Sequence, residues 1–354
     1  MTSPKKILVC VLDWGLGHAT RCIPVIREFA SRGCDVVLAS SGSALKLLQI
    51  EFPTLDHIQL PAYNPEYSKT DSLVGQMIRQ LPKFRKVIEA EHKIVEEFVD
   101  QNGVDIVISD NRYGCWSSTA ESIFITHQLK VLTPSPFAWA APGINWVLGR
   151  QIKKFNQVWI PDRRGSGLTE VFFSKIVKQQ RFIGWLSRFM GSDRPEIRYA
   201  IMAIISGPEP QRSIFYDKVK KQLSQLNVKS LIVSGEPGEP YLREVGNLTT
   251  VNHLNAQDME RAISQSELLV GRSGYSTIMD LIALGKNAIF VPTPGQPEQE
   301  HFAEILRNKG MIFSQSQEEF ELKKAMEQST SYSGLGVLKM NTDALREAVT
   351  SLLV

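Results

Sequence analysis

The residues whose types and spacing most clearly suggest chemistry lie between positions 266 and 303. A short apolar run ends in Gly271-Arg272-Ser273-Gly274, and a helix is predicted to begin near Tyr275 or Ser276. A helix that begins at the carboxyl end of a parallel strand offers unpaired amide groups and the positive end of its dipole, which together favour phosphate. Asp280 lies about one turn into this helix, where its carboxylate could accept hydrogen bonds from a ribose beside the phosphate.

Further polar side chains follow the next predicted strand, residues 288–291. Gln296, Glu298, Gln299 and Glu300 place four hydrogen-bonding side chains within five residues. That density suits a ligand with many hydroxyl groups, such as a sugar. The same spacing is typical of an ordinary strand–helix–strand unit with a solvated loop, so both interpretations stay open at this point.

A second candidate site lies near the N-terminus. His18 stands at the start of a predicted helix, residues 19–32, where the helix dipole lowers an imidazole pKa and favours the neutral form that can accept a proton. A histidine that only caps the helix or closes the turn is the alternative. Asp13, in the same loop, is the other candidate acid or base, although local backbone amides could equally hold its carboxylate.

Asp110 follows a predicted buried strand, residues 104–109. It therefore lies at the carboxyl edge of the sheet, where open α/β folds build their sites. There it could orient His18 or contact an acceptor. A helix N-cap is the competing role, because Asp is a preferred capping residue.

The predicted elements indicate how these residues would be positioned. Residues 7–12 form a continuous apolar strand of the kind found inside parallel sheets, and a glycine turn, the helix at 19–32 and a strand at 36–39 follow. The second half repeats this plan, with strands at 202–205, 231–233 and 250–251 and helices at 213–226 and 258–263. This alternation predicts an α/β fold with two Rossmann-like, doubly wound domains.

A polar stretch rich in glycine and proline, residues 184–195, marks the predicted domain boundary. We expect an N-terminal domain over residues 1–190, which contains the candidate acid–base residues, a C-terminal domain over residues 196–335, which contains the candidate phosphate site, and a terminal helical segment over residues 336–354. Between residues 45 and 99 the sequence predicts an irregular region and then a long helix at 76–99, which Pro82 would kink or divide.

Composition limits the class of protein. With 354 residues and 43% hydrophobic residues, the chain can bury a large core, and its length favours two domains. A net charge of +3 is too balanced to require nucleic acid as a partner. The four cysteines show no metal-ligand spacing, which suits reduced thiols in a cytosol.

The sequence also favours a cytoplasmic location, at the inner face of a membrane. No signal peptide is recognisable at the N-terminus, and no run approaches the roughly 18 apolar residues of a membrane span. The basic, amphipathic stretch at 79–86 and the basic stretch at 150–188 could lie on anionic lipid as a peripheral contact. A surface helix that packs its apolar side on the core is the alternative.

Taken together, these motifs resemble those of a known protein family. From position 7 to about position 311 the chain resembles the GT-B glycosyltransferases of family 28, a group that includes the N-acetylglucosaminyltransferase that makes lipid II and the diacylglycerol glycosyltransferases. The strongest similarity is the run from Gly271 to Asp280, followed by Pro292-Thr293-Pro294-Gly295-Gln296-Pro297-Glu298-Gln299. The resemblance implies two Rossmann-like domains that face a cleft, which closes when the donor binds.

The resemblance also implies roles for individual residues. Ser273 and Gly274 would meet a diphosphate, Asp280 the ribose, and Gln299 and Glu300 the sugar. The backbone of Leu254 would read the uracil edge, Arg212 would lie near the phosphates, and the pair Gly17-His18 would face the reaction centre. The expected donor-binding residues are Gly17, Arg212, Leu254, Arg272, Ser273, Gly274, Ser276, Asp280, Gln296, Gln299 and Glu300, and the expected catalytic residues are His18, Asp13 and Asp110.

Three departures from the family pattern matter. The usual glycine-rich turn is replaced by Gly207-Pro208-Glu209-Pro210-Gln211, in which two prolines remove amide donors and Glu209 adds negative charge near the expected phosphates. Glu300 replaces an amide, which makes a sugar other than N-acetylglucosamine plausible. Trp14 and Leu16 stand in the first-domain turn where the family has smaller residues.

The first hypothesis is therefore an inverting glycosyltransferase that moves a hexose or N-acetylhexosamine from a UDP-sugar to a hydroxyl acceptor. A lipid-linked acceptor or a cell-envelope glycan is one candidate class. The family binds the donor diphosphate without a metal, so neither a metal site nor a cofactor is expected. A UDP-sugar 2-epimerase, which shares the fold, and a non-catalytic nucleotide-sugar-binding protein are the alternatives.

Overall fold

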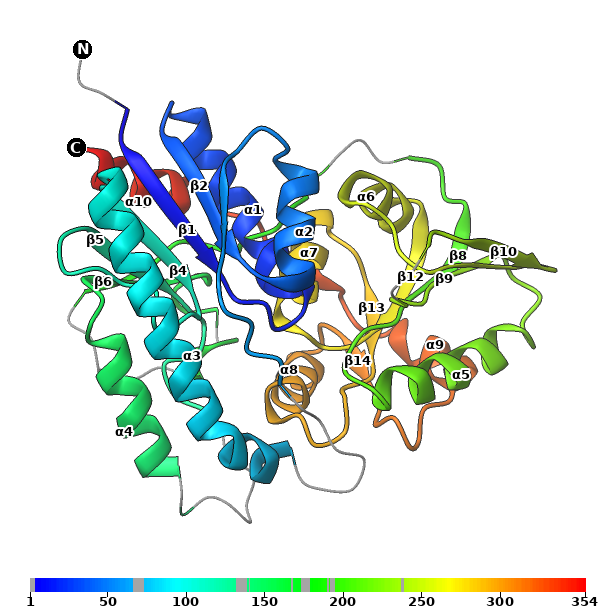
Figure 1. The fold of residues 1–354 in the computed structure, drawn as a ribbon. Coiled ribbons are helices and arrows are strands. Elements are labelled where there is room, and N and C mark those ends of the chain that lie inside the picture. Colours follow the sequence, from blue (N-terminus) through cyan, green and yellow to red (C-terminus); the bar gives the residue numbers. More distant parts are fainter. Residues whose placement is uncertain are drawn as a thin grey trace. The chain divides into compact units, whose positions relative to one another are not determined.

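The computed structural model describes residues 4–65, 73–131, 139, 141–166, 168–172, 179–189, 191, 195–236 and 239–354, and for residues 73–78 the backbone alone. The chain divides into two compact units. The first contains Met1–Arg188 together with Asn341–Val354, and the second contains Phe189–Met340. Each unit has its own sheet, flanked by helices (Figure 1).

Among the described residues, the sheet of the first unit has seven parallel strands in the order β3-β2-β1-β4-β5-β6-β7. The chain moves outward from β1 to β3 and then returns to place β4 on the other side of β1. The carboxyl ends of β1 and β4 therefore form the switch point, the position at which open α/β sheets bind ligands. These strands are β1 (Lys6–Val11), β2 (Asp35–Ser40), β3 (His57–Gln59), β4 (Ile106–Asp110), β5 (Glu121–Ile125), β6 (Gln157–Ile160) and β7 (Gln180–Phe182).

Helices connect these strands and cover the sheet. The connection through α1 leads outward and the connection through α3 leads back, and right-handed crossovers of opposite direction put the two helices on opposite faces (Figure 1). The helices of this unit are α1 (Leu16–Ser31), α2 (Gly42–Glu51), α3 (Leu73–Asn102), α4 (Ala141–Ile152) and α10 (Asp343–Leu353), with a 3₁₀ turn, η2, at Glu170–Phe172.

The second unit repeats the plan with the strand order β10-β11-β9-β8-β12-β13-β14. All neighbours are parallel except β10 and β11, which form an antiparallel hairpin at one edge. Its switch point lies between β8 (Tyr199–Ile204) and β12 (Ser266–Gly271). The other strands are β9 (Ser230–Val233), β10 (Leu242–Val245), β11 (Leu248–Val251), β13 (Ala288–Phe290) and β14 (Phe313–Ser314), and the helices are α5 (Gln211–Leu223), α6 (Ala256–Ser264), α7 (Tyr275–Leu284), α8 (Pro297–Asn308) and α9 (Leu322–Ser329), with a 3₁₀ turn, η3, at Leu335–Val337.

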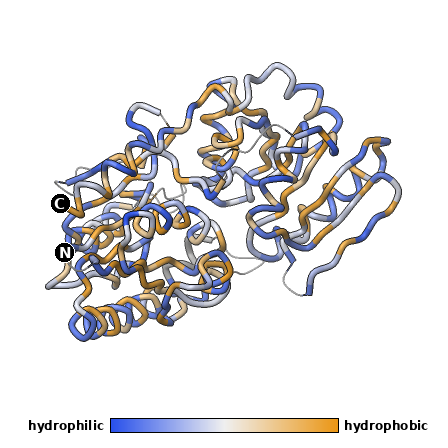
Figure 2. The backbone as a smooth tube through the Cα atoms, turned by 90° about the horizontal axis from the view of Figure 1, so that it is seen from above, coloured by the Kyte–Doolittle hydropathy of each residue, from blue (hydrophilic) through white to orange (hydrophobic). Residues whose placement is uncertain are grey.

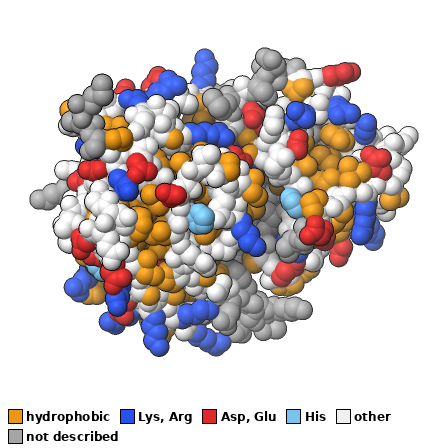
Figure 3. Space-filling view, turned by 45° about the horizontal axis from the view of Figure 1, so that its top comes forward, with side chains coloured by type: hydrophobic (Ala, Val, Ile, Leu, Met, Phe, Trp, Pro, Cys, Tyr) orange, Lys and Arg blue, Asp and Glu red, His pale blue; other side chains and the backbone are white. Residues whose placement is uncertain are grey.

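Hydrophobic burial explains why the central strands form. β1 and β4 are buried along almost their whole length, as expected for strands covered on both faces, and hydrophobic stretches run through the interior of each unit (Figure 2). Most of the described charged side chains lie outside, and a few, among them Asp110, Arg112 and Arg272, are buried. On the face drawn in Figure 3, basic and acidic side chains are interspersed, in keeping with the small net charge.

The predicted fold class is confirmed, and several local predictions need correction. The region after residue 45 is not irregular, because it contains α2 and β3. Pro82 does not divide the long helix, since α3 is continuous around it. No helix begins after β4, so Asp110 is not an N-cap. Strands β5, β6, β7, β10 and β14 were not predicted. Residues 190 and 192–194 of the predicted boundary, and residues 167 and 173–178 of the basic stretch 150–188, lie outside the described residues.

Candidate functional site

The carboxyl ends of β1 and β4 bring the first candidate site together. The turn after β1 contains Gly15, whose φ of 82° lies in the left-handed region, and α1 begins at the next residue. Gly17 is thus the second residue of α1, and its carbonyl accepts a hydrogen bond from Thr20. His18 is the third residue of the helix. Asp110 ends β4, directly across the switch point.

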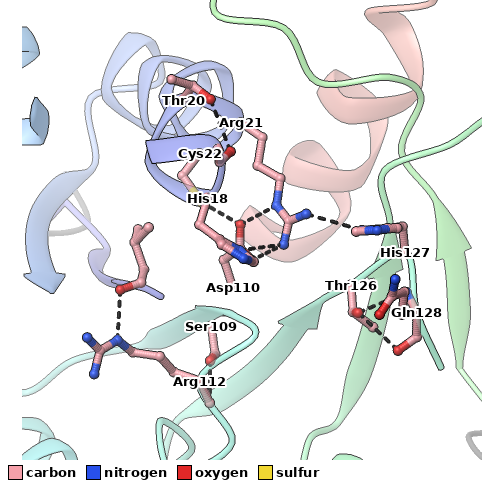
Figure 4. A network of polar contacts seen from close by, with 12 residues as sticks. His18, Thr20, Arg21, Cys22, Ser109, Asp110, Arg112, Thr126, His127 and Gln128 are labelled. Atoms are coloured by element: carbon pink, nitrogen blue, oxygen red, sulfur yellow. Dashed lines mark hydrogen bonds and ion pairs between the residues drawn. The ribbon is translucent and has the colours of Figure 1, made fainter. Parts of the chain in front are cut away.

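His18 and Asp110 contact each other in this position (Figure 4). His18 Nδ1 lies 3.0 Å from Asp110 Oδ1, and the Asp110 side chain is fully buried. The His18 side chain is 17% exposed, and no described residue bonds to its Nε2. Burial, and then the nearby Arg21 cation, lower the pKa of His18. The imidazole is therefore neutral at neutral pH, with one nitrogen held inside and the other open to a ligand.

Arg21, which the sequence analysis did not single out, completes this cluster. Its guanidinium donates to both oxygens of Asp110, with Nε 2.5 Å from Oδ2. Cys22 Sγ donates to the same Oδ2 at 3.1 Å. Burial alone would raise the pKa of Asp110, but Arg21, followed by His18, holds that pKa well below its usual range. Asp110 is therefore a charged carboxylate with a built-in counterion. Arg21 lies three residues after His18, and this helical spacing was a signal for it in the sequence.

Asp13 occupies a different environment, although it lies in the same loop. Its Oδ1 accepts a hydrogen bond from Arg112 Nη2 at 3.3 Å. Arg112 is fully buried, and it also bonds to Glu91, Ser41 and the carbonyl of Val11. Asp13 thus belongs to a buried ionic network that ties α3 to the carboxyl ends of β1 and β4.

The second candidate site lies at the switch point of the other sheet. β12 ends at Gly271, and α7 begins at Tyr275 with Gly274 as its N-cap. Gly274 has an ordinary φ of −72°, and a Cβ built on it would meet nothing closer than Thr277 Oγ1 at 3.8 Å. The fold therefore does not need glycine here. What glycine provides is close access to the backbone at a helix N-terminus, where an anion would lie.

The side chains of the same loop face inward. Arg272 is buried and donates to the carbonyls of Val291 and Gln211 and to Gln317 Oε1, while its guanidinium lies 4.1 Å from the ring centroid of Phe215. Burial lowers its pKa to about 10, so it remains a cation at neutral pH. Arg272 therefore joins three loops from within. Its place among the donor-binding residues stays a prediction, since these contacts are all with the protein itself.

Three further residues that are expected to bind the donor make hydrogen bonds inside the unit. The Ser273 hydroxyl donates to the carbonyl of Gln299 at 2.7 Å, and Gln299 Oε1 accepts from the amide of Thr293. Glu300 Oε1 accepts from the amide of Gly295 at 2.9 Å. These bonds fix the loop between β13 and α8. The Gln299 amide nitrogen and the second Glu300 oxygen have no hydrogen bond with any described residue.

The other predicted donor residues are spread along the same edge of the sheet. Leu254 follows β11, and no described residue hydrogen-bonds to its backbone. Ser276 and Gln296 are half-buried at the starts of α7 and α8. Asp280 is buried in α7, one turn beyond Ser276. All of these residues lie at the carboxyl ends of β11, β12 and β13, as the sequence predicts.

Arg212 lies at the start of α5 and is paired with a neighbour. Its Nε is 3.0 Å from Glu209 Oε1, and the same carboxylate accepts from the Ser213 hydroxyl and amide. An internal carboxylate therefore occupies the N-terminus of α5 in this structure. The family pattern has a glycine-rich turn at this position.

Thr293 is a residue of this edge that the sequence analysis did not assign. Its hydroxyl is buried and has no hydrogen-bond partner among the described residues. A Cβ built on Gly207 would lie 3.5 Å from that oxygen, so Thr293 lies across from the loop after β8. A buried hydroxyl without a partner costs free energy unless a ligand or water satisfies it.

Metal sites and membrane-spanning helices are both absent from the described ranges of the chain. No group of three or more His, Cys, Asp or Glu side chains in them is arranged to hold a metal ion. Every helix in them is too short or too polar to cross a membrane.

Comparisons with known proteins agree with this geometry. Residues 213–343 match the glycosyltransferase family 28 C-terminal domain. An uncharacterized glycosyltransferase of Methanosarcina acetivorans is 22% identical over 330 residues, which cover 86% of this chain and 84% of the relative. The UDP-N-acetylglucosamine--N-acetylmuramyl-(pentapeptide) pyrophosphoryl-undecaprenol N-acetylglucosamine transferase of Lactococcus lactis is 25% identical over 244 residues, 63% of this chain and 61% of that enzyme.

Solved structures identify the fold. The glycotransferase of kitacinnamycin superposes with a TM-score of 0.68 at 16% sequence identity, over 100% of both chains. The fold is therefore that of the GT-B glycosyltransferases. The match of residues 213–343 to the glycosyltransferase family 28 C-terminal domain, together with this fold, supports the resemblance seen in the sequence.

Proposed function

We propose that this chain is an inverting transferase that moves a hexose or N-acetylhexosamine from a UDP-sugar to a hydroxyl group. The observation that carries the proposal is the His18–Asp110 pair at the switch point of the first sheet, in a chain whose second unit contains a family 28 domain. The first unit would activate the acceptor, and the second would hold the donor.

The proposed reaction uses the exposed nitrogen of His18. Nε2 takes the proton of the acceptor hydroxyl as its oxygen attacks the anomeric carbon, and the bond from that carbon to the diphosphate oxygen breaks. Attack on the face opposite the departing diphosphate inverts the anomeric centre. Asp110 stabilises the imidazolium that forms, because its carboxylate lies 3.0 Å from Nδ1.

The donor side would stabilise the negative charge that develops on UDP. The amide groups at the start of α7 and the Arg212 cation supply positive potential without a metal, so no cofactor is included in the proposal. Asp280 would hold the ribose, and the Leu254 backbone would read the base. Ser276, Thr293, Gln296, Gln299 and Glu300 would surround the phosphates and the sugar.

The similarity to the Lactococcus transferase supports a lipid-linked acceptor of the cell envelope, because that enzyme's name specifies an undecaprenol-linked substrate. Such an acceptor would be reached from the cytoplasm at the inner face of the membrane. The exposed Trp146 and Val147 of α4, with Arg150 above the Trp146 ring, offer a surface for peripheral membrane contact. No nucleic-acid partner is proposed.

Gly274 offers a direct test of the donor site. We expect UDP at 100 times its Kd to stabilise the protein by about 2.7 kcal/mol, whereas GDP and dTDP at the same concentration stabilise it less. Gly274→Ala should keep the unliganded melting temperature, since the fold tolerates a Cβ there, and should weaken UDP binding about tenfold. Gly143→Ala in α4, where a Cβ also meets nothing, is the matched control.

The products separate the alternatives. Transfer of the sugar to an acceptor with inverted anomeric configuration would support the proposal. An epimerised nucleotide sugar formed without acceptor would identify an epimerase instead. UDP binding without turnover across a broad acceptor panel would leave a non-catalytic binding protein, and the absence of a stability change with any nucleotide would contradict the donor site itself.

A further inference from the structure

Arg21 makes more contacts in the acceptor-side cluster than a counterion needs. Nε and Nη2 hold the two oxygens of Asp110, Nη2 also lies 2.8 Å from His18 Nδ1, and Nη1 lies 3.2 Å from His127 Nδ1 (Figure 4). The guanidinium is 4% exposed. One buried cation therefore touches both the carboxylate and the imidazole of the proposed base.

Asp110 and Arg21 require opposite hydrogen-bonding roles of His18 Nδ1. Asp110 Oδ1, 3.0 Å from His18 Nδ1, can only accept a hydrogen bond, whereas Arg21 Nη2, 2.8 Å from the same nitrogen, can only donate one. A neutral imidazole carries a single proton. With the proton on Nδ1, His18 donates to Asp110 and Nε2 has a free lone pair. With the proton on Nε2, Nδ1 accepts from Arg21 and the outer nitrogen cannot act as a base.

We propose that Arg21 is a positioning residue that sets which tautomer of His18 is present, and therefore whether Nε2 can take a proton from the acceptor. This inference rests on the proposed function, because it concerns the same base. It adds a residue that does not touch substrate and acts through Asp110 and His18.

The charges around His18 show why such a residue is useful. The groups that act on it are Arg21 from α1, Asp110 from β4 and His127 from the loop after β5, and Cys22 of α1 bonds to Asp110. Burial and the bond to Asp110 keep Cys22 protonated as a donor. Helix α10 also packs on α1, but its Asp343 and Arg346 are exposed and paired with each other.

Without Arg21, Asp110 would be a buried carboxylate whose main polar partner is an imidazole. That arrangement favours the imidazolium, which has no lone pair for the acceptor proton. Arg21 compensates the carboxylate and keeps His18 neutral. The same guanidinium also donates a hydrogen bond to Nδ1 when that nitrogen carries no proton. It therefore also stabilises the tautomer of His18 that cannot act as a base.

The test is Arg21→Met, which keeps an unbranched side chain and removes the guanidinium group with its charge. Nitrogen NMR of imidazole-labelled protein reports the tautomer and the titration of His18 directly. We expect the titration midpoint of His18 to rise by at least about one pH unit and the neutral form to be the Nδ1-protonated tautomer alone. The acid limb of kcat/KM should move upward in parallel, so that activity falls about tenfold at pH 6 and recovers at high pH.

Two further variants show whether a change in the titration of His18 comes from the charge of Arg21. Arg21→Met combined with Asp110→Asn removes both charges and should return the titration midpoint towards the original value. Arg27→Met, on the same helix but bonded to Glu51 and the carbonyl of Arg188, is the control and should leave His18 unchanged. If Arg21→Met does not fold, Arg21→Lys keeps the charge but cannot hold both carboxylate oxygens, and it should still shift the tautomer ratio.

An unchanged tautomer ratio and titration of His18 in the folded variants would overturn the inference, as would an activity loss that is equal at every pH. The NMR measurement does not require turnover. A shifted His18 titration in a protein that transfers no sugar would therefore reject the proposed function alone. Transfer with an unshifted titration would reject the role of Arg21 alone.

Discussion

At the scale of single residues, the structure distinguishes two candidates that the sequence left equal. His18 has one nitrogen bonded to Asp110 and one without a partner among the described residues. Asp13 compensates Arg112, a fully buried cation that has Glu91 as its other anionic partner. A carboxylate that balances a buried charge gives up that interaction when it takes a proton. The geometry therefore favours His18 as the base.

This difference predicts unequal effects of two conservative variants. His18→Gln should lower kcat by about 10²- to 10⁴-fold, the usual contribution of general base catalysis. Asp13→Asn should lower kcat less than about tenfold and instead reduce the free energy of unfolding, because it leaves Arg112 less well compensated. Steady-state kinetics and urea denaturation of both variants measure the two effects. A full loss of activity in Asp13→Asn with little change in His18→Gln would reverse the assignment.

The pH dependence follows from the same cluster. Burial and Arg21 lower the pKa of His18, so the neutral, active form persists below pH 6.5 and is lost only as pH falls through the lowered value. The wild-type acid limb of kcat/KM should therefore lie below pH 6.5. A limb above that value would show that His18 is not the titrating base.

At the scale of elements, the helices and strands that were predicted are those with a clear pattern in their own residues. The start of α7 at Tyr275 follows from glycine spacing and is confirmed, and the helix ends at Gly285, which has a φ of 62°. Strand β5 was missed because its five residues, which begin with Glu121, have no strong pattern of their own and are held by β4 and β6. Short strands of this kind depend on their neighbours in the sheet.

The candidate sites also combine features that the sequence predicts with features that it does not predict. The meeting of His18 and Asp110 could be expected, because both follow parallel strands at one edge. The contacts that Arg272 makes inside the unit could not be expected, since a motif gives the order of residues but not the direction of a long side chain. His127 was missed together with the strand that positions it.

The loop between β8 and α5 leads to a prediction at this scale. Glu209 pairs with Arg212 and bonds to the amide of Ser213, so a carboxylate occupies the helix end that would otherwise face a phosphate. Glu209→Gln removes a negative charge and releases Arg212, and should tighten UDP binding about 3- to 10-fold. Calorimetric titration with UDP measures the change. Glu267→Gln, an equal change of charge at the exposed amino end of β12, is the control. Weaker binding in Glu209→Gln would show that the carboxylate supports the donor site instead.

At the scale of the whole molecule, the end of the chain returns to the unit in which it began. The sequence analysis assigned residues 336–354 to a segment of their own, whereas the structure places Asn341–Val354 in the first unit. Leu345, Ala348 and Val349 are buried on one side of α10, which packs on α1. The last helix of the chain therefore packs against the helix that contains His18.

The first unit also carries the surface on which the proposed membrane contact depends. Trp146 and Val147 of α4 are 63% and 50% exposed, and the Arg150 guanidinium lies 4.9 Å from the Trp146 ring centroid. Exposed Lys153 and Lys154 follow the end of the helix. On α3, Leu81 is exposed near Arg85 and Lys86, as the amphipathic sequence predicts. An aromatic ring among cations suits the boundary between lipid headgroups and acyl chains.

Vesicle sedimentation tests this surface. The protein should sediment with phosphatidylglycerol vesicles at low salt and much less with neutral phosphatidylcholine vesicles, because cations near an anionic surface contribute about 1 kcal/mol each. Binding should weaken steeply towards 1 M salt, where the Debye length falls to about 3 Å. Trp146→Ser with Arg150→Ser should reduce binding at least about tenfold, whereas Leu242→Ser, which removes a residue that is 65% exposed in the second unit, should not. Equal binding of all three proteins would place the contact elsewhere. Absence of binding to anionic vesicles at low salt would remove the membrane from the proposal and favour an acceptor that is free in solution.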